Sequence, residues 1–167
     1  MEVDCKVSKL WINLLEEEKK LPPTYQAVTA NEIKLIHQEG VECRLVSGEF
    51  EGQEGTVKST TTTAMLRLNE GKSFTFQLPS NHHACVYVLE GEGLIQQNAS
   101  YLPHQFVQFA QEEGSIELHA NIATKVLILS GLPIDEPLVT YGPFVAASET
   151  AIRQAMFDYQ QGMFGQM

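Results

Sequence analysis

Four side chains are the candidates for binding a transition metal in this sequence: His82, His83, Glu117 and His119. Imidazole and carboxylate groups are common ligands of iron and zinc in proteins. Glu117 and His119 lie two residues apart, so a strand would place both on one face. His82 and His83 are adjacent, and because alternate residues of a strand point to opposite faces, at most one of them could face an interior.

The pattern of these residues falls short of a metal site. A Glu/His pair supplies two ligands, whereas a catalytic iron or zinc ion usually has three or more. The two adjacent histidines follow Pro79, Ser80 and Asn81, a stretch typical of a loop. The simpler interpretation of His82 and His83 is a solvated or hydrogen-bonded pair, and a metal role is the alternative. We therefore expect no metal ligands, with the four residues as fallback candidates.

A second polar feature is the loop at 48–55 (GEFEGQEG), which carries Glu49, Glu51 and Glu54 between glycines. Its simplest interpretation is a solvated loop. A divalent cation or a basic protein partner is the alternative, because each would be bound by several carboxylates.

Length and composition restrict the class of protein. The chain has 167 residues, of which 43% are apolar and 19% charged, as expected for one globular domain. The net charge of −10 and the lack of a basic stripe argue against direct binding of nucleic acid or anionic membrane. No segment is apolar enough for a membrane span or a signal peptide, so we expect an intracellular, cytoplasmic protein. Cys5, Cys43 and Cys85 are few and scattered, which favours buried free thiols over disulfides.

Alternating apolar and polar residues predict short strands separated by turns, as in a β-sandwich or barrel. Strands and helices do not alternate along the sequence, which argues against a parallel sheet. The predicted strands are Lys9–Leu14, Val41–Gly48, Val57–Leu68, Ser73–Leu78, Ala84–Glu90, Gly93–Gln97, Gln105–Ala110, Ser115–Ala120 and Thr124–Ser130.

One amphipathic helix closes the sequence. Ser148 is a suitable N-cap, and Ile152, Ala155, Met156 and Tyr159 share one face at helical spacing. That apolar face must pack against the barrel or against a partner. The expected divisions are an N-terminal strand and extended Pro-containing arm at 1–40, a barrel at 41–147, and a helix with its tail at 148–167.

Several segments resemble a known family. The stretch 87–93 (YVLEGEG), after a turn at Gly71, resembles the cupin barrel. The segments LWINL at 10–14, PPTYQ at 22–26, VSGEFEG at 46–52 and GLPIDEPLVTYGPFVAASETAIRQAMFDYQQGMFG at 131–165 together resemble the pirin family. The resemblance implies an all-β fold: a single cupin-type barrel (double-stranded β-helix, or jelly roll) with a C-terminal α-helix. Pirins are bicupins, and the chain resembles their second half without the first, iron-bearing barrel.

The general cupin motif, G-x5-H-x-H-x4-E-x6-G, fits the spacing between Gly71 and Gly91 without a gap. The ligand positions then hold Gln77, Pro79 and Ala84. None of these is a competent ligand for a transition metal, and glutamine is at best a weak neutral donor.

The second cupin motif ends in G-x2-H-x3-N, which Gly114 and Asn121 match. Glu117 occupies its histidine position. The spacing of a metal cupin is therefore present while the ligand chemistry is not. We expect no cofactor, and iron only if the fallback residues bind it.

The resemblance carries functional expectations. Pirins bind iron, act as transcriptional cofactors in eukaryotes, and in some members oxidise quercetin-type flavonols. With its ligand positions changed, this chain is expected to be a metal-free binding or regulatory module rather than an enzyme. The alternatives are a metal-dependent, quercetinase-like dioxygenase, or one half of a split pirin that needs a metal-bearing partner.

The same resemblance predicts a partner. In a bicupin the two barrels pack face to face, so a single half exposes apolar surface. We expect a homodimer, or a separate protein partner, bound through the surface near Trp11, Ile12 and the C-terminal helix.

Overall fold

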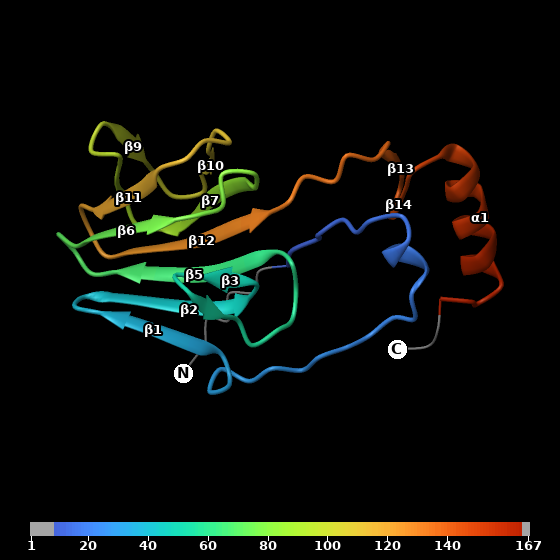
Figure 1. The fold of residues 1–167 in the computed structure, drawn as a ribbon, viewed down its shortest axis with the longest axis horizontal. Helices are drawn as coiled ribbons and strands as arrows, with labels where there is room; N and C mark the ends of the chain where they lie inside the picture. The colour runs from blue at the N-terminus through green and yellow to red at the C-terminus, as the bar shows by residue number, and fades with distance from the viewer. Residues whose placement is uncertain (1–8, 165–167) are drawn as a thin grey trace, which may run out of the picture. The chain divides into compact units, whose positions relative to one another are not determined.

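The computed structural model describes residues 9–164 and consists mainly of antiparallel strands (Figure 1). One sheet has six strands and a second has four. The six strands, in their order across the sheet, are β1 (Lys34–Gln38), β2 (Val41–Ser47), β5 (Thr62–Leu68), β12 (Thr124–Gly131), β7 (His83–Glu90) and β10 (Phe106–Gln108). The four strands are β6 (Ser73–Gln77), β11 (Ser115–Ala120), β8 (Gly93–Ile95) and β9 (Ala99–Tyr101).

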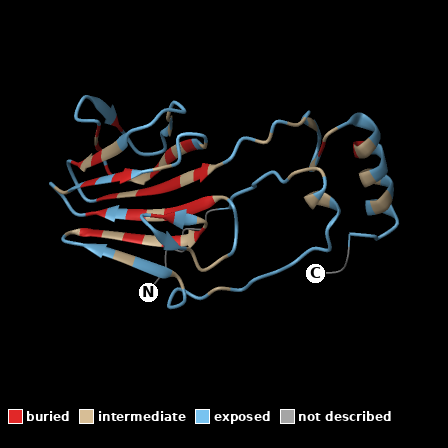
Figure 2. Ribbon diagram, viewed as in Figure 1, coloured by how far each residue is buried: buried red, intermediate tan, exposed pale blue. Residues whose placement is uncertain are grey.

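The core lies where the apolar faces of these two sheets meet. Along β2 and β6 buried and more exposed residues alternate, as the pleat of a strand with one core face requires. In Figure 2 the buried positions accordingly recur along the central strands. The largest fully buried side chains include Leu45 from β2, Phe76 from β6 and Leu118 from β11. The two sheets and the core between them confirm the predicted all-β fold.

Contacts within the chain divide it into two compact units, which we describe separately. One unit spans Tyr25–Pro133 and contains both large sheets. The other joins the N-terminal segment up to Thr24 with the segment from Ile134 onward. Residues 25–40 thus group with the sheets, and residues 134–147 group with the C-terminal helix.

The smaller unit is built from a 3₁₀ turn at Glu18–Lys20, the hairpin of β13 (Val139–Tyr141) with β14 (Phe144–Ala146), and helix α1 (Glu149–Gln160). As predicted, the Ser148 side chain caps α1, accepting a hydrogen bond from the Ala151 N–H. Gly162, at φ +72°, ends it: its N–H donates to Tyr159, and the next N–H donates to Asp158.

One predicted strand is wrong. Residues 9–14 form no strand, and within the described part of the chain no neighbouring strand pairs with them. A strand gains its stability from a hydrogen-bonded neighbour, so an alternating apolar pattern does not suffice. Leu10, Trp11 and Ile12 are exposed instead.

Other predicted strands differ at their ends. The strand predicted from Val57 begins at Thr62, because the preceding residues leave the ladder after one isolated bridge at Val57. The sequence pattern also missed β1, a largely exposed edge strand in which Ile36 alone is partly buried. The predicted loop at 48–55 contains a short hairpin of β3 (Glu49–Phe50) and β4 (Gln53–Glu54).

Among the described residues, no helix has the length and apolar character needed to cross a membrane.

Candidate binding cleft

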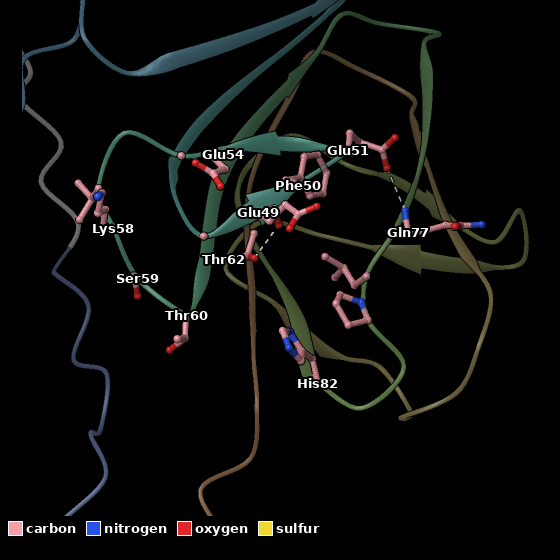
Figure 3. A pocket seen from close by; sticks show the side chains of 16 residues that line it. Glu49, Phe50, Glu51, Glu54, Lys58, Ser59, Thr60, Thr62, Gln77 and His82 are labelled. Atoms are coloured by element: carbon pink, nitrogen blue, oxygen red, sulfur yellow. Dashed lines mark hydrogen bonds between the residues drawn. The ribbon is translucent and has the colours of Figure 1, made fainter. Parts of the chain in front are cut away.

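An open cleft of about 1030 Å³ lies beside the β3–β4 hairpin in the larger unit (Figure 3). Three segments enclose it: the hairpin with its flanking glycines, residues 57–62, and residues 77–82. The side chains that surround its opening include Glu49, Glu54, Thr62, Gln77 and His82. The lining therefore combines polar side chains with the apolar Leu78 and Pro79.

The hairpin is anchored to the barrel through Phe50, which is only 2% exposed. Its ring packs against Phe76, with centroids 5.5 Å apart, and against Phe74, at 6.3 Å. The turn between the two strands is Glu51-Gly52, and both residues have positive φ, as a two-residue hairpin turn of type I′ requires. The anchor and the turn fix the hairpin's position.

The base of the hairpin is also closely fitted. A Cβ atom on Gly48 would lie 2.6 Å from the Cα of Thr62, and one on Gly55 would lie 2.6 Å from the Cα of Ser47. The Gly55 N–H donates to the Gly48 carbonyl, and the Thr62 hydroxyl donates to the Glu49 carbonyl. The cleft wall is thus preformed, which reduces the entropy that a ligand must overcome.

The three glutamates of the hairpin have different surroundings. The Glu51 carboxylate accepts the Gln77 N–H at 3.2 Å, which joins the hairpin to the end of β6. Glu49 and Glu54 are direct partners across the hairpin, so their negative charges lie close together. The predicted acidic loop is therefore an ordered wall of the cleft.

His82 lies at the end of the cleft beside Ser130. The two residues share a hydrogen bond of 2.9 Å between His82 Nδ1 and Ser130 Oγ. Burial lowers the pKa of His82 below the usual value of 6.5, because a buried imidazolium loses hydration. The ring is therefore uncharged at neutral pH, and Nε2 is its remaining polar atom.

Two of the four cupin ligand positions line the cleft. Gln77 and Pro79, at the first two ligand positions, line it. Ala84, at the third, is a buried residue of β7 without a donor atom. Glu117, at the fourth, is on β11 between the buried residues of the core face, and does not line the cleft.

The remaining fallback ligands are not brought together. His83 is exposed at the start of β7, whereas His82 lines the cleft. Glu117 accepts a hydrogen bond from the Gln97 side chain at 3.0 Å. His119 Nδ1 is 2.9 Å from Ser73 Oγ. Glu117 and His119 flank the buried Leu118 of β11, so both side chains lie on the outward face of the sheet.

The residues present do not fit a transition metal. Across residues 9–164, no three His, Cys, Asp or Glu side chains are grouped in a way that could hold a metal ion. The cupin ligand positions offer one amide, from Gln77, one carboxylate, from Glu117, and no further donor. Iron and zinc sites need nitrogen, sulfur or carboxylate donors converging on one point.

Cys43 and Cys85, the two cysteines within residues 9–164, are in surroundings that keep their thiols protonated. Cys43 is fully buried in the core, and burial, with a smaller effect from Glu51, raises its pKa to about 12. Cys85 is partly buried, and burial raises its pKa as well. Both thiols therefore remain protonated at neutral pH and are poor nucleophiles. Cys43 confirms the buried-thiol prediction, and Cys5 lies outside the described residues.

Comparison with known proteins agrees with this architecture. The model of the Pirin C-terminal cupin domain matches residues 63–165. The chain belongs to the pirin family. Pirin-like protein 2 of Arabidopsis thaliana is 34% identical, in an alignment that covers 94% of this chain and 52% of the relative. A pirin-like protein of Solanum lycopersicum is 32% identical and is covered to 56%.

One solved structure matches over most of this chain. The crystal structure of a quercetin 2,3-dioxygenase from Acinetobacter baumannii superposes with a TM-score of 0.87 at 30% identity. The match covers 93% of this chain and 55% of that chain. The predicted cupin barrel is therefore confirmed. The chain spans about half the length of the curated pirin relatives that it matches.

Part of the cleft was not foreseen from the sequence. Lys58, Ser59 and Thr60 line it, although the sequence pattern placed them in a strand. A signal was available: these three consecutive polar residues break the alternation that a half-buried strand requires. The predicted acidic loop at 48–55, the cupin spacing at Gln77 and Pro79 and the loop before His82 were the sequence-based indications of the cleft.

Proposed function

We propose that this chain is a metal-independent binding or regulatory module of the pirin type. The observation that carries the proposal is the chemistry of the cupin ligand positions, where Gln77, Pro79 and Ala84 replace metal donors. The cleft beside these positions is preformed and open, so it can receive a ligand without metal chemistry. We place the protein in the cytoplasm, where free thiols such as Cys43 persist.

Elemental analysis of the purified, untagged chain tests the absence of a metal. After expression in iron-supplemented medium we expect less than about 0.1 equivalent of any transition metal, because no donor set converges among the residues that the structure describes. Near-stoichiometric iron would contradict the proposal. The fallback ligands His82, His83, Glu117 and His119 would then be replaced one at a time, with loss of iron as the measurement.

A second candidate function is that of a dioxygenase. Its support is the similarity to the quercetin 2,3-dioxygenase of Acinetobacter baumannii. This chain covers 55% of that protein, and residues 9–164 offer no fitting donor set, so the activity would require iron from a metal-bearing partner, as in a split pirin. Consumption of quercetin by the iron-loaded chain alone would favour the dioxygenase over the binding module.

We also propose that the smaller unit binds a protein partner, most simply a second copy. Trp11 is 87% exposed, and several apolar side chains of the same unit are also exposed. Its only buried apolar residues, among those described, are Ala146 and Ile152. A unit with so little core gains stability when its apolar surface is covered.

Sedimentation velocity tests this association. At about 10 μM we expect a dimer, since obligate partners remain associated well above their dissociation constant. The substitution Trp11→Glu should convert the dimer to monomer, because the charge cannot be buried without a partner. Tyr25→Glu is the matched control, since Tyr25 is 92% exposed and lies in the other unit. A wild-type monomer at this concentration would contradict self-association.

A further inference from the structure

We propose that the cleft binds a small, uncharged ring compound with several neighbouring hydroxyl groups, a ring polyol. The inference rests on the proposed binding function and adds the chemical class of the ligand. It follows from the hydrogen-bonding groups that line the cleft, from the apolar side chains of Leu78 and Pro79 and from the sign of the cleft's charge. The inference concerns residues of the larger unit alone.

One wall supplies acceptors. The carboxylates of Glu49 and Glu54 lie opposite each other on the hairpin. Within residues 9–164 neither carboxylate has an ion-pair or hydrogen-bond partner, whereas Glu51 is occupied by the Gln77 N–H. An ionised carboxylate only accepts hydrogen bonds, so this wall matches a ligand that donates from more than one position.

The other walls supply groups that both donate and accept. Ser59 and Thr60 lie across the opening from Gln77 (Figure 3). The Ser59 Oγ accepts the Thr61 N–H at 3.1 Å, which leaves its O–H free to donate. The Thr60 hydroxyl can likewise donate and accept. These groups match hydroxyls, which also donate and accept.

The apolar lining and the charge narrow the class further. Leu78 and Pro79 form an aliphatic surface between Gln77 and His82, against which the C–H face of a ring can lie. Three glutamates and one lysine, Lys58, line the cleft, and His82 is uncharged, so the lining is negative overall. Anionic ligands such as sugar phosphates are therefore repelled. A volume of about 1030 Å³ is sufficient for one or two rings.

Titration of the full chain with defined probes, followed by ¹H–¹⁵N NMR, tests the ligand class. The neutral probes are myo-inositol, glucose and galactose, and the matched anion is myo-inositol 1-phosphate. We expect at least one neutral probe to shift the amides of Gly48, Thr60 and Gln77 with a dissociation constant of about 1–10 mM, as a fragment-sized ligand allows. The phosphate should bind at least about tenfold more weakly.

Putrescine separates recognition of hydroxyls from attraction of positive charge. If putrescine shifts the cleft amides and no neutral polyol does, the polyol assignment is wrong. It is also wrong if no probe shifts them up to about 50 mM, the weakest binding expected of such ligands. The polyol assignment can fail in these ways while elemental analysis still finds the chain free of metal. The metal-independent binding function would then stand, so failure of the ligand class can be distinguished from failure of the proposed function.

Variants then locate the binding. Glu49→Ala should weaken binding of the neutral probe about tenfold, because a hydrogen bond to a charged acceptor is lost. Glu70→Ala removes an exposed glutamate that does not line the cleft, and should leave the dissociation constant unchanged. Equal losses in both variants would indicate a general charge effect and would overturn the assignment.

Discussion

Gly93→Ala is expected to destabilise the protein by about 3 kcal/mol or more, as overpacking together with a broken buried hydrogen bond predicts. Gly93 is buried in β8 and pairs with both Ala120 and Tyr101. A Cβ atom there would overlap the His119 carbonyl oxygen and the Tyr101 ring. Because Tyr101 is only 1% exposed, its ring has little room to withdraw.

The same substitution removes a second interaction. The Tyr101 hydroxyl donates to the His119 carbonyl at 2.9 Å, directly where the new methyl group would lie. The donor and the acceptor would be separated within the fold, and an unsatisfied buried group is costly. The free energy of unfolding in urea is the measurement, with an unchanged slope showing that the compactness of the two states is preserved.

Gly71→Ala is the matched control. Gly71 has φ +71°, but no atom lies within 4 Å of the position that its Cβ would occupy. Its substitution carries backbone strain without overlap, so we expect a loss of about 1 kcal/mol. If Gly93→Ala were no more destabilising than Gly71→Ala, the close pairing of β8 with β11 and β9 would be contradicted.

For Gly93, the sequence predicts the turn and the neighbouring strands but not the need for glycine. A Gly-rich turn was recognisable at 91–93 from its composition, and strands on either side followed from alternation. The need for glycine at position 93 was not recognisable, because it arises from a carbonyl 26 residues away in the chain, at His119. Contacts between distant segments leave no local signal.

The candidate site was only partly predictable, because its geometry also depends on contacts between distant segments. Cupin spacing located Gln77 and Pro79, and those residues line the cleft. The acidic loop was recognised by composition, but its hairpin geometry depends on Phe50 packing against strand β6. The N-terminal segment shows the opposite error: residues 9–14 have the apolar pattern of a strand, yet a strand also requires a partner that pattern cannot supply.

The second large effect is expected for Phe50→Ala, which should destabilise the fold by about 3–5 kcal/mol. The Phe50 ring is nearly fully buried and completes an aromatic cluster with Phe74 and Phe76. Truncation to alanine leaves a cavity between the hairpin and β6, and the lost contacts are the hairpin's main attachment to the core. Unfolding in urea gives the free energy change.

Phe50→Ala should also loosen the hairpin that forms one wall of the cleft. Without its anchor the hairpin opens more readily, so the Gly55 and Gln77 amides, which donate to Gly48 and Glu51, should exchange hydrogen faster than in the wild type. Phe50→Leu, which keeps most of the volume, should lose only about 1.5 kcal/mol and retain protection of both amides. If Phe50→Ala lost stability while those amides stayed protected, the hairpin would be held by something other than Phe50. The wall of the cleft would then be independent of the aromatic cluster, whereas the packing of Phe50 on Phe76 requires the two to be coupled.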